Sequence, residues 1–123
     1  MTKKPPLPEC TRMILAIRDA KDVLTGKWKT TIIGALMFKG KLRFMDLMRE
    51  VDGIAPKMLS KELQELEMQQ LVTRTVVNSK PITVEYELTE HGKSLDPLLR
   101  EIAKWGDLHR TKIMKKKKTA TEQ

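Results

Sequence analysis

Apolar residues recur every three or four positions through the first third of the chain, which predicts two amphipathic helices. The first spans about residues 10–24. The second is expected to begin after an N-cap at Thr25 and to end at Gly40, because hydroxyl side chains cap helix starts and glycine suits helix ends. The apolar positions are Met13, Ile17, Ala20 and Leu24 in the first helix, and Trp28, Ile32, Ile33, Leu36 and Met37 in the second.

Two further helices are predicted on either side of a tight turn. Before them, the residues KLRF at 41–44 fit either a single strand or an extended link. A brief amphipathic helix then covers 44–51, and Pro56 suits the first position of a helix that runs to about residue 70. The turn between them contains Asp52-Gly53, since glycine adopts a positive φ without steric cost.

The hydrophobic period then changes from helical to alternating. Residues 71–78 and 82–89 are rich in β-branched side chains and are joined by Ser79-Lys80-Pro81, which predicts a β-hairpin. The inward face of this hairpin is expected to carry Val72, Val76, Val84, Tyr86 and Leu88.

A last helix is predicted after an N-cap at Thr89 and is expected to end near Arg110. Pro97 lies inside it, so a kink or a break is expected there. Its apolar stripe consists of Leu95, Leu98, Leu99, Ile102, Trp105 and His109. The chain is therefore predicted to be mainly helical α+β, with an extended lead-in over 1–9, one domain over 10–110 and a basic, mobile tail over 111–123.

The helix that starts at Pro56 has one face for a core and another for a partner. The apolar face carries Leu59, Leu63 and Leu66, and the polar face carries Lys57, Ser60, Lys61 and Gln64. Such a face alone is usually a solvated surface. Here a helix, a turn, a second helix and a hairpin follow in the order of a winged helix-turn-helix. We therefore expect the polar face to enter the major groove of double-stranded DNA, with Lys80 near a neighbouring phosphate or the minor groove.

The net charge of +8 changes this picture only slightly. The segment from Lys112 to Lys118 holds five lysines and no acidic residue, so the rest of the chain is mildly basic. An excess of Lys and Arg is typical of proteins that bind nucleic acid or anionic membranes. No apolar run approaches the roughly 20 residues of a membrane span, so no membrane partner is expected.

The sequence offers little material for catalysis or metal binding. Cys10 is the single cysteine, and the N-terminus lacks the apolar stretch of a signal peptide, which favours a cytoplasmic location. His91 and His109 lack partners at metal-ligand spacing, and no nucleophile–base set or glycine-rich phosphate loop is visible. We expect neither an enzyme nor a metal or cofactor site.

Several motifs occur in a fixed order from about Val23 to Gly106: GKWK, LRF, IAPKMLSKELQELE, LVTRTVV, VEYELTEHGKSLDPLL and KWG. They resemble those of the HxlR family of winged helix-turn-helix regulators, a bacterial group related to the MarR regulators. The resemblance implies a homodimer that binds a pseudo-palindromic operator, with the first and last helices in the dimer interface. The DNA contacts it implies come from Arg43, Lys57, Met58, Ser60, Lys61 and the wing around Lys80.

Three positions depart from the family pattern. Ala55 stands where a small hydroxyl residue commonly caps the recognition helix, which removes a hydrogen bond worth about 1 kcal/mol. Thr83 stands where the second wing strand often carries a basic residue. Cys10 lies farther upstream of GKW than the reactive cysteine of some members, and Leu15 occupies that spacing, so the resemblance does not assign a sensing role to Cys10.

Three alternatives stay open. The fold could serve as a protein-interaction module with only non-specific nucleic-acid contact. Cys10, near Arg12 at a helix start, could be a redox or electrophile sensor. Finally, Trp28, Trp105 and the methionines are interpreted as core or dimer packing, with a flexible surface for a small-molecule effector as the alternative. Repression by occupying promoter DNA is favoured, and activation at some promoters is also open.

Overall fold

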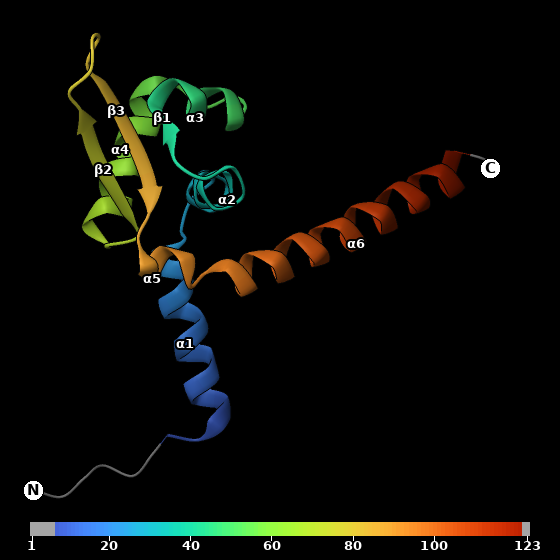
Figure 1. Ribbon diagram of the computed structural model, residues 1–123. Helices are drawn as coiled ribbons and strands as arrows, with labels where there is room; N and C mark the ends of the chain where they lie inside the picture. Colours follow the sequence, from blue (N-terminus) through green and yellow to red (C-terminus); the bar gives the residue numbers. More distant parts are fainter. Residues whose placement is uncertain (1–6, 122–123) are drawn as a thin grey trace, which may run out of the picture.

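The computed structural model describes residues 7–121, with side chains as far as Lys115. Its elements are α1 (Glu9–Val23), α2 (Lys29–Lys39), β1 (Leu42–Arg43), α3 (Phe44–Glu50), α4 (Pro56–Met68), β2 (Val72–Val77), β3 (Thr83–Leu88), α5 (Glu90–Lys93) and α6 (Asp96–Thr121). Figure 1 shows a body formed by the sheet and α2–α4, from which α1 and α6 project in different directions. The mainly helical winged helix-turn-helix predicted from the sequence is confirmed.

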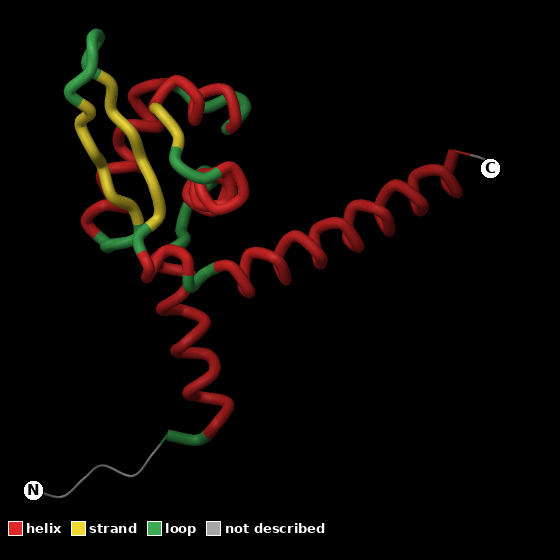
Figure 2. The backbone as a smooth tube through the Cα atoms, viewed as in Figure 1, coloured by secondary structure: helices red, strands yellow, loops and turns green. Residues whose placement is uncertain are grey.

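The three strands form one antiparallel sheet in the order β1-β3-β2 (Figure 2). The hairpin of β2 and β3 is the predicted wing, and Arg74 lies opposite Tyr86 in its register. The segment KLRF contributes β1, whose Leu42 also pairs with Tyr86, on the other edge of β3. Of the two readings of this segment, the strand is correct.

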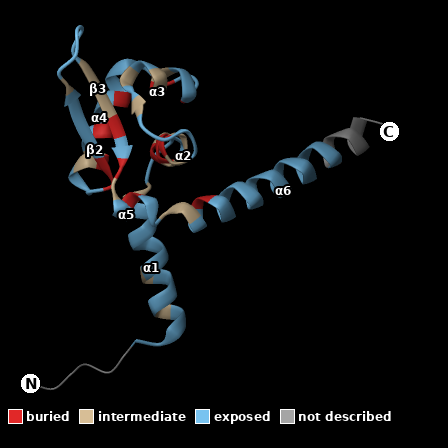
Figure 3. Cartoon of the chain, viewed as in Figure 1, coloured by how far each residue is buried: buried red, intermediate tan, exposed pale blue. Residues whose placement is uncertain are grey.

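The core lies between α2, α3 and α4 and the inner face of the sheet (Figure 3). Its buried side chains come from every one of these elements, and the predicted apolar stripes supply most of them. Each fully buried Leu or Ile contributes about 1.5–3 kcal/mol relative to an exposed side chain. The core residues are Ile32, Ile33, Leu36, Leu47, Val51, Ile54, Leu59, Leu63, Leu66, Leu71, Val72, Tyr86, Leu88 and Leu99.

The prediction that Thr25 caps the second helix was wrong. The Thr25 hydroxyl donates to the carbonyl oxygens of Lys21 and Asp22, both at 2.8 Å, and so it closes the end of α1. The N-cap of α2 is Trp28, which makes no side-chain capping bond. A hydroxyl between two helices can cap either the end of the first helix or the start of the second. Here it binds the free carbonyl groups at the end of the first helix. Gly40 ends α2 as predicted, with φ of 84°.

The final helical segment is divided, as Pro97 indicated. Thr89 caps only the short α5, where its Oγ1 accepts a 3.0 Å hydrogen bond from the Gly92 N–H. After a break, α6 starts at Asp96 with Pro97 in its first turn, where a missing N–H costs nothing. The helix then continues to Thr121 instead of ending near Arg110, because Lys, Met and Ala are good helix formers and no proline follows.

The prediction that Val76 is on the buried face of the hairpin was also wrong. Val76 is 50% exposed, whereas Val72, Tyr86 and Leu88 are buried and Val84 is half-buried. Val76 lies near the far end of β2, where the wing extends beyond the helices that cover its base (Figure 1). Alternation predicts which side of a strand a residue faces, but not how far the covering layer reaches.

The two projecting helices leave apolar side chains uncovered. α1 has no buried residue, and Leu99 is the single buried residue of α6 among the side chains described as far as Lys115. Exposed apolar side chains on these helices are Met13, Ile14, Ile17, Leu98, Ile102, Trp105, Leu108, Ile113 and Met114. Within residues 7–121, no helix combines the length and apolar character needed to cross a bilayer.

Candidate DNA-binding surface

A tight turn sets α4 at an angle to α3 and presents one of its faces. Gly53 in this turn has φ of +87°, in the region where L side chains are strained. Pro56 occupies the first position of α4, and the N-cap Ala55 makes no side-chain hydrogen bond, as its methyl side chain requires. The entry to α4 is therefore fixed by backbone geometry and by the buried Ile54.

The two faces of α4 separate as the sequence predicts. Leu59 and Leu66 are fully buried, and Leu63 is 1% exposed. The opposite face is solvent-accessible and comprises Lys57, Met58, Ser60, Lys61 and Gln64, which with Ala55 border one open hollow. Neither Lys57 nor Lys61 takes part in an ion pair within residues 7–121. Two cations and two hydrogen-bonding side chains are thus presented together.

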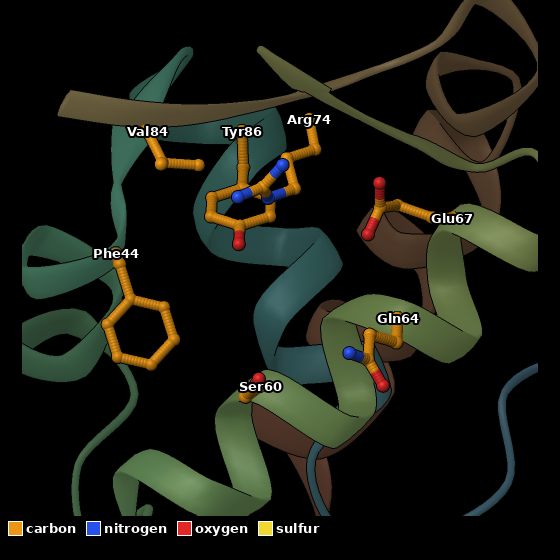
Figure 4. A pocket seen from close by; sticks show the side chains of 7 residues that line it. All are labelled: Phe44, Ser60, Gln64, Glu67, Arg74, Val84 and Tyr86. Atoms are coloured by element: carbon orange, nitrogen blue, oxygen red, sulfur yellow. The ribbon is translucent and has the colours of Figure 1, made fainter. Parts of the chain in front are cut away.

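The exposed face of α4 and the wing border a common hollow of about 490 Å³ (Figure 4). Ser60, Gln64 and Glu67 line it from α4, and Arg74 and Tyr86 line it from the paired strands. Arg74 was not among the residues predicted to contact DNA. The available signal was its position two residues from Val72 in an alternating strand, which puts the guanidinium on the helix side of the sheet. The hollow joins helix and wing into one continuous surface.

Arg43 lies where β1 passes into α3, and it is exposed. Its backbone N–H donates to Asp46 Oδ2 at 3.1 Å, and Arg49 Nη2 donates to Asp46 Oδ1 at 2.6 Å. The bond from Arg49, followed by that from the Arg43 N–H, lowers the pKa of Asp46 below its ordinary 3.8. Arg43, Arg49 and Thr83 border another hollow, separate from the one between α4 and the wing. After Arg74, Arg49 is a second arginine near this surface that was not predicted from the sequence.

The wing tip presents Lys80 to solvent. The turn before it is closed by a 2.9 Å hydrogen bond from the Ser79 N–H to the Val77 carbonyl. The Ser79 hydroxyl also donates to the carbonyl of Pro81 at 2.8 Å. Thr83, at the start of β3, has its Oγ1 buried and without a hydrogen-bond partner in the described structure, so this hydroxyl does not substitute for an exposed basic side chain.

A buried ion cluster connects α2 to the inner side of α4. Lys29 is 6% exposed and Glu62 is 8% exposed, and Lys29 Nζ donates to Glu62 Oε2 at 2.5 Å. The same ammonium group also donates to Glu65. Burial disfavours the charge on Lys29, but the two carboxylates outweigh burial and raise its pKa. This cluster was not predicted, although Glu62 and Glu65 directly precede the core residues Leu63 and Leu66 in the sequence of α4.

The remaining candidates are dispersed. Cys10 is exposed in the first turn of α1. His109 stacks on Trp105 along α6 with ring centroids 4.8 Å apart, and this pair lies far along the chain from His91. Across residues 7–121, no group of three or more His, Cys, Asp or Glu side chains could hold a metal ion.

Comparison with known proteins gives the same fold. The sequence matches the HxlR-like helix-turn-helix family over residues 23–114. It is 44% identical over 86 residues to the HTH-type transcriptional regulator YkvN of Bacillus subtilis (strain 168), covering 70% of this chain and 72% of that protein. It is 37% identical over 99 residues to YtcD of the same organism, covering 80% and 78%.

Solved structures agree with these matches. The redox regulator HypR in its reduced form superposes with a TM-score of 0.72 at 37% identity, covering 77% of this chain and 93% of that one. The predicted family resemblance is therefore confirmed. The family and these relatives are transcriptional regulators, as expected, and not enzymes. The chain belongs to the HxlR-like helix-turn-helix family of transcriptional regulators.

Proposed function

We propose that the protein binds a pseudo-palindromic operator as a homodimer and represses transcription by occupying promoter DNA. The observation that carries this proposal is the exposed, basic face of α4 beside the wing. The DNA contacts are assigned to Arg43, Lys57, Met58, Ser60, Lys61, Gln64 and Lys80, all of which are exposed.

The chemistry of these side chains matches the major groove. The groove, about 12 Å wide, admits one α-helix, and residues in the first turns of that helix reach the base edges. Lys57 and Lys61 would bind phosphate or guanine, and Gln64 would pair with adenine through its amide. Lys80 would meet a phosphate beside the groove, which fixes register without reading sequence.

The homodimer is proposed from the projecting helices. α6 has 26 residues, so it is about 39 Å long at 1.5 Å per residue. Between Leu98 and Leu108 its exposed apolar side chains recur at spacings of three and four. An uncovered apolar stripe of this kind indicates an interaction site. Pairing α1 and α6 with a second copy would cover both stripes, and operator binding requires that the resulting two-fold axis place the two α4 helices about 34 Å apart.

Selection of bound duplexes from a random library tests this proposal directly. We expect the wild-type protein to enrich an inverted repeat whose half-sites are one helical turn apart. In gel shifts, it should bind that duplex at least about a thousandfold more tightly than a scrambled one. Sedimentation should give a dimer at the same protein concentration. Equal affinity for both duplexes would instead support the protein-interaction module, whose nucleic-acid contact is non-specific.

Thiol sensing through Cys10 is a second candidate. Cys10 is exposed and lies at the start of a helix assigned to the dimer interface, and the structural relative HypR is a redox regulator. Oxidation by diamide in the presence of a small thiol should then change operator affinity in the wild type but not in Cys10→Ser. An identical response of both proteins would remove Cys10 from the mechanism.

A further inference from the structure

The ion cluster on the inner side of α4 lies directly behind the proposed DNA-reading face. Lys29 enters from α2 and donates to Glu62 and Glu65, which are three positions apart on α4. Glu62 is buried, whereas the Glu65 side chain is 40% exposed and therefore reaches from the core toward the surface. Glu65 is the member of the cluster that can also meet a surface cation.

Lys61 is that cation. It precedes Glu65 by four positions, so the two side chains lie on adjacent turns of one helix face. The hydrogen bond and the charge of Lys29 lower the pKa of Glu65, and the charge of Lys61 lowers it further. No ion pair joins Lys61 to Glu65 or to any other residue of the described chain. The Glu65 carboxylate is bonded to Lys29 instead. Glu65 therefore stands between a buried lysine and an exposed one.

We propose that Lys29 is a positioning residue for DNA recognition: by holding Glu65 from the core side, it leaves the Lys61 ammonium free for DNA. The inference rests on the proposed function, because it requires Lys61 to bind DNA. Without Lys29, the Glu65 carboxylate would turn to Lys61, and DNA would have to compete for that ammonium group.

Charge balance explains why this arrangement needs a buried lysine. Lys29 carries one positive charge against two carboxylates, and Lys61 supplies the second positive charge nearby. Without Lys29, Glu62 would be a buried carboxylate with no partner, beside the partly exposed carboxylate of Glu65, and this is strongly disfavoured. Lys29 thus stabilises the contact between α2 and α4, and the same bond determines which partner Glu65 has.

A double-mutant cycle separates this role from mere stabilisation. The core pair is removed as Lys29→Met/Glu62→Gln, which leaves the net charge unchanged and leaves no carboxylate buried at position 62. Glu65→Gln is then introduced into the wild type and into this double variant. Glu65→Gln removes one negative charge in both backgrounds, so long-range attraction to DNA cancels when the two gains are compared.

We expect Glu65→Gln to raise affinity for the selected operator more in the double variant than in the wild type, by an additional factor of about two to five. Adding Lys61→Ala to both backgrounds should abolish that difference. Affinities are measured by fluorescence anisotropy, and circular dichroism melts confirm that each protein is folded at the assay temperature. If the double variant does not fold, Lys29→Gln/Glu62→Met replaces it with the same charge.

The outcomes distinguish the inference from the proposed function. Equal gains from Glu65→Gln in the two folded backgrounds, with Lys61→Ala weakening the wild type, would overturn the role of Lys29 alone. A silent Lys61→Ala in the wild type would overturn the assignment of Lys61 to DNA, and the role of Lys29 with it. A purely structural Lys29 would lower the melting temperature without producing coupling between positions 65 and 61.

Discussion

The Arg43 backbone N–H donates to Asp46 Oδ2 at 3.1 Å, so the residue that ends β1 is fixed by a carboxylate in the first turn of α3. A negative side chain at this end of a helix also interacts favourably with the helix dipole. The same carboxylate accepts from Arg49, which holds two exposed arginines around one acidic residue. The position of Arg43 beside the proposed DNA surface therefore depends on the charge of Asp46.

Acid should weaken this capping interaction. The pKa of Asp46 is lowered in the folded state, chiefly by the hydrogen bond from Arg49, so the folded state prefers the ionised carboxylate. Its stabilising contribution is complete above the ordinary value of 3.8 and is lost as pH falls through the lower folded value. Asp46→Asn should melt at a lower temperature near neutral pH, and its melting curve should approach that of the wild type in acid. Asp19→Asn on α1 is the control, and an equal difference at every pH would contradict the expectation.

Lys61→Ala should change sequence preference as well as affinity. Loss of a base contact costs about 1–3 kcal/mol and relaxes selectivity at one position, measured by gel shifts over single-base variants of the selected duplex. Lys116→Ala is the comparison: its side chain lies outside the described residues, and it should weaken binding to all duplexes about equally. Equal losses on operator and scrambled DNA for Lys61→Ala would refute its base-reading role.

Two glycine substitutions should have opposite effects on stability. A Cβ added at Gly92 in α5 would lie 2.2 Å from the Leu71 carbonyl oxygen, and this backbone atom cannot move aside easily. Gly92→Ala should therefore destabilise the fold by more than about 2 kcal/mol in urea denaturation. Gly34→Ala in α2 meets nothing within 4 Å and should stabilise it by about 0.5–1 kcal/mol. A tolerated Gly92→Ala would show that α5 can shift away from the sheet.

A charge on the apolar stripe of α6 should separate the proposed dimer. Ile102 is 44% exposed in the single chain, and Ile102→Asp would bury an unpaired carboxylate in the interface. We expect the dimer dissociation constant to rise at least about a hundredfold in sedimentation equilibrium. Asp107→Asn, which changes a charge about 140° around α6 from Ile102, is the control. An unchanged constant for Ile102→Asp would place the interface elsewhere.

The periodic parts of the fold could be predicted from the sequence because burial repeats with the geometry of each element. The leucines of α4, the glycine turn before it and the alternating hairpin after it illustrate this, and their order along the chain indicates the winged helix-turn-helix. The exposure of Lys57, Lys61 and Gln64 follows from the same periodicity. Their contacts with DNA stay a prediction.

The errors and omissions concern choices between partners that are distant in sequence. Thr25 could cap either of two helix ends, and only the packed chain determines which carbonyls it meets. Lys29 reads as an ordinary polar residue beside an apolar stripe until α4 brings two carboxylates to it. The exposure of Val76 depends on how far the helices extend over the wing. Local periodicity contains none of these long-range relations.

β3 pairs with β1 along one edge and with β2 along the other, so it is common to the helix-turn-helix and to the wing. A tilt of the wing would strain the Leu42–Tyr86 pairing and pull on the chain that enters α3. The two parts of the surface are therefore mechanically coupled, and the protein should select duplexes whose groove width and curvature satisfy both parts at once.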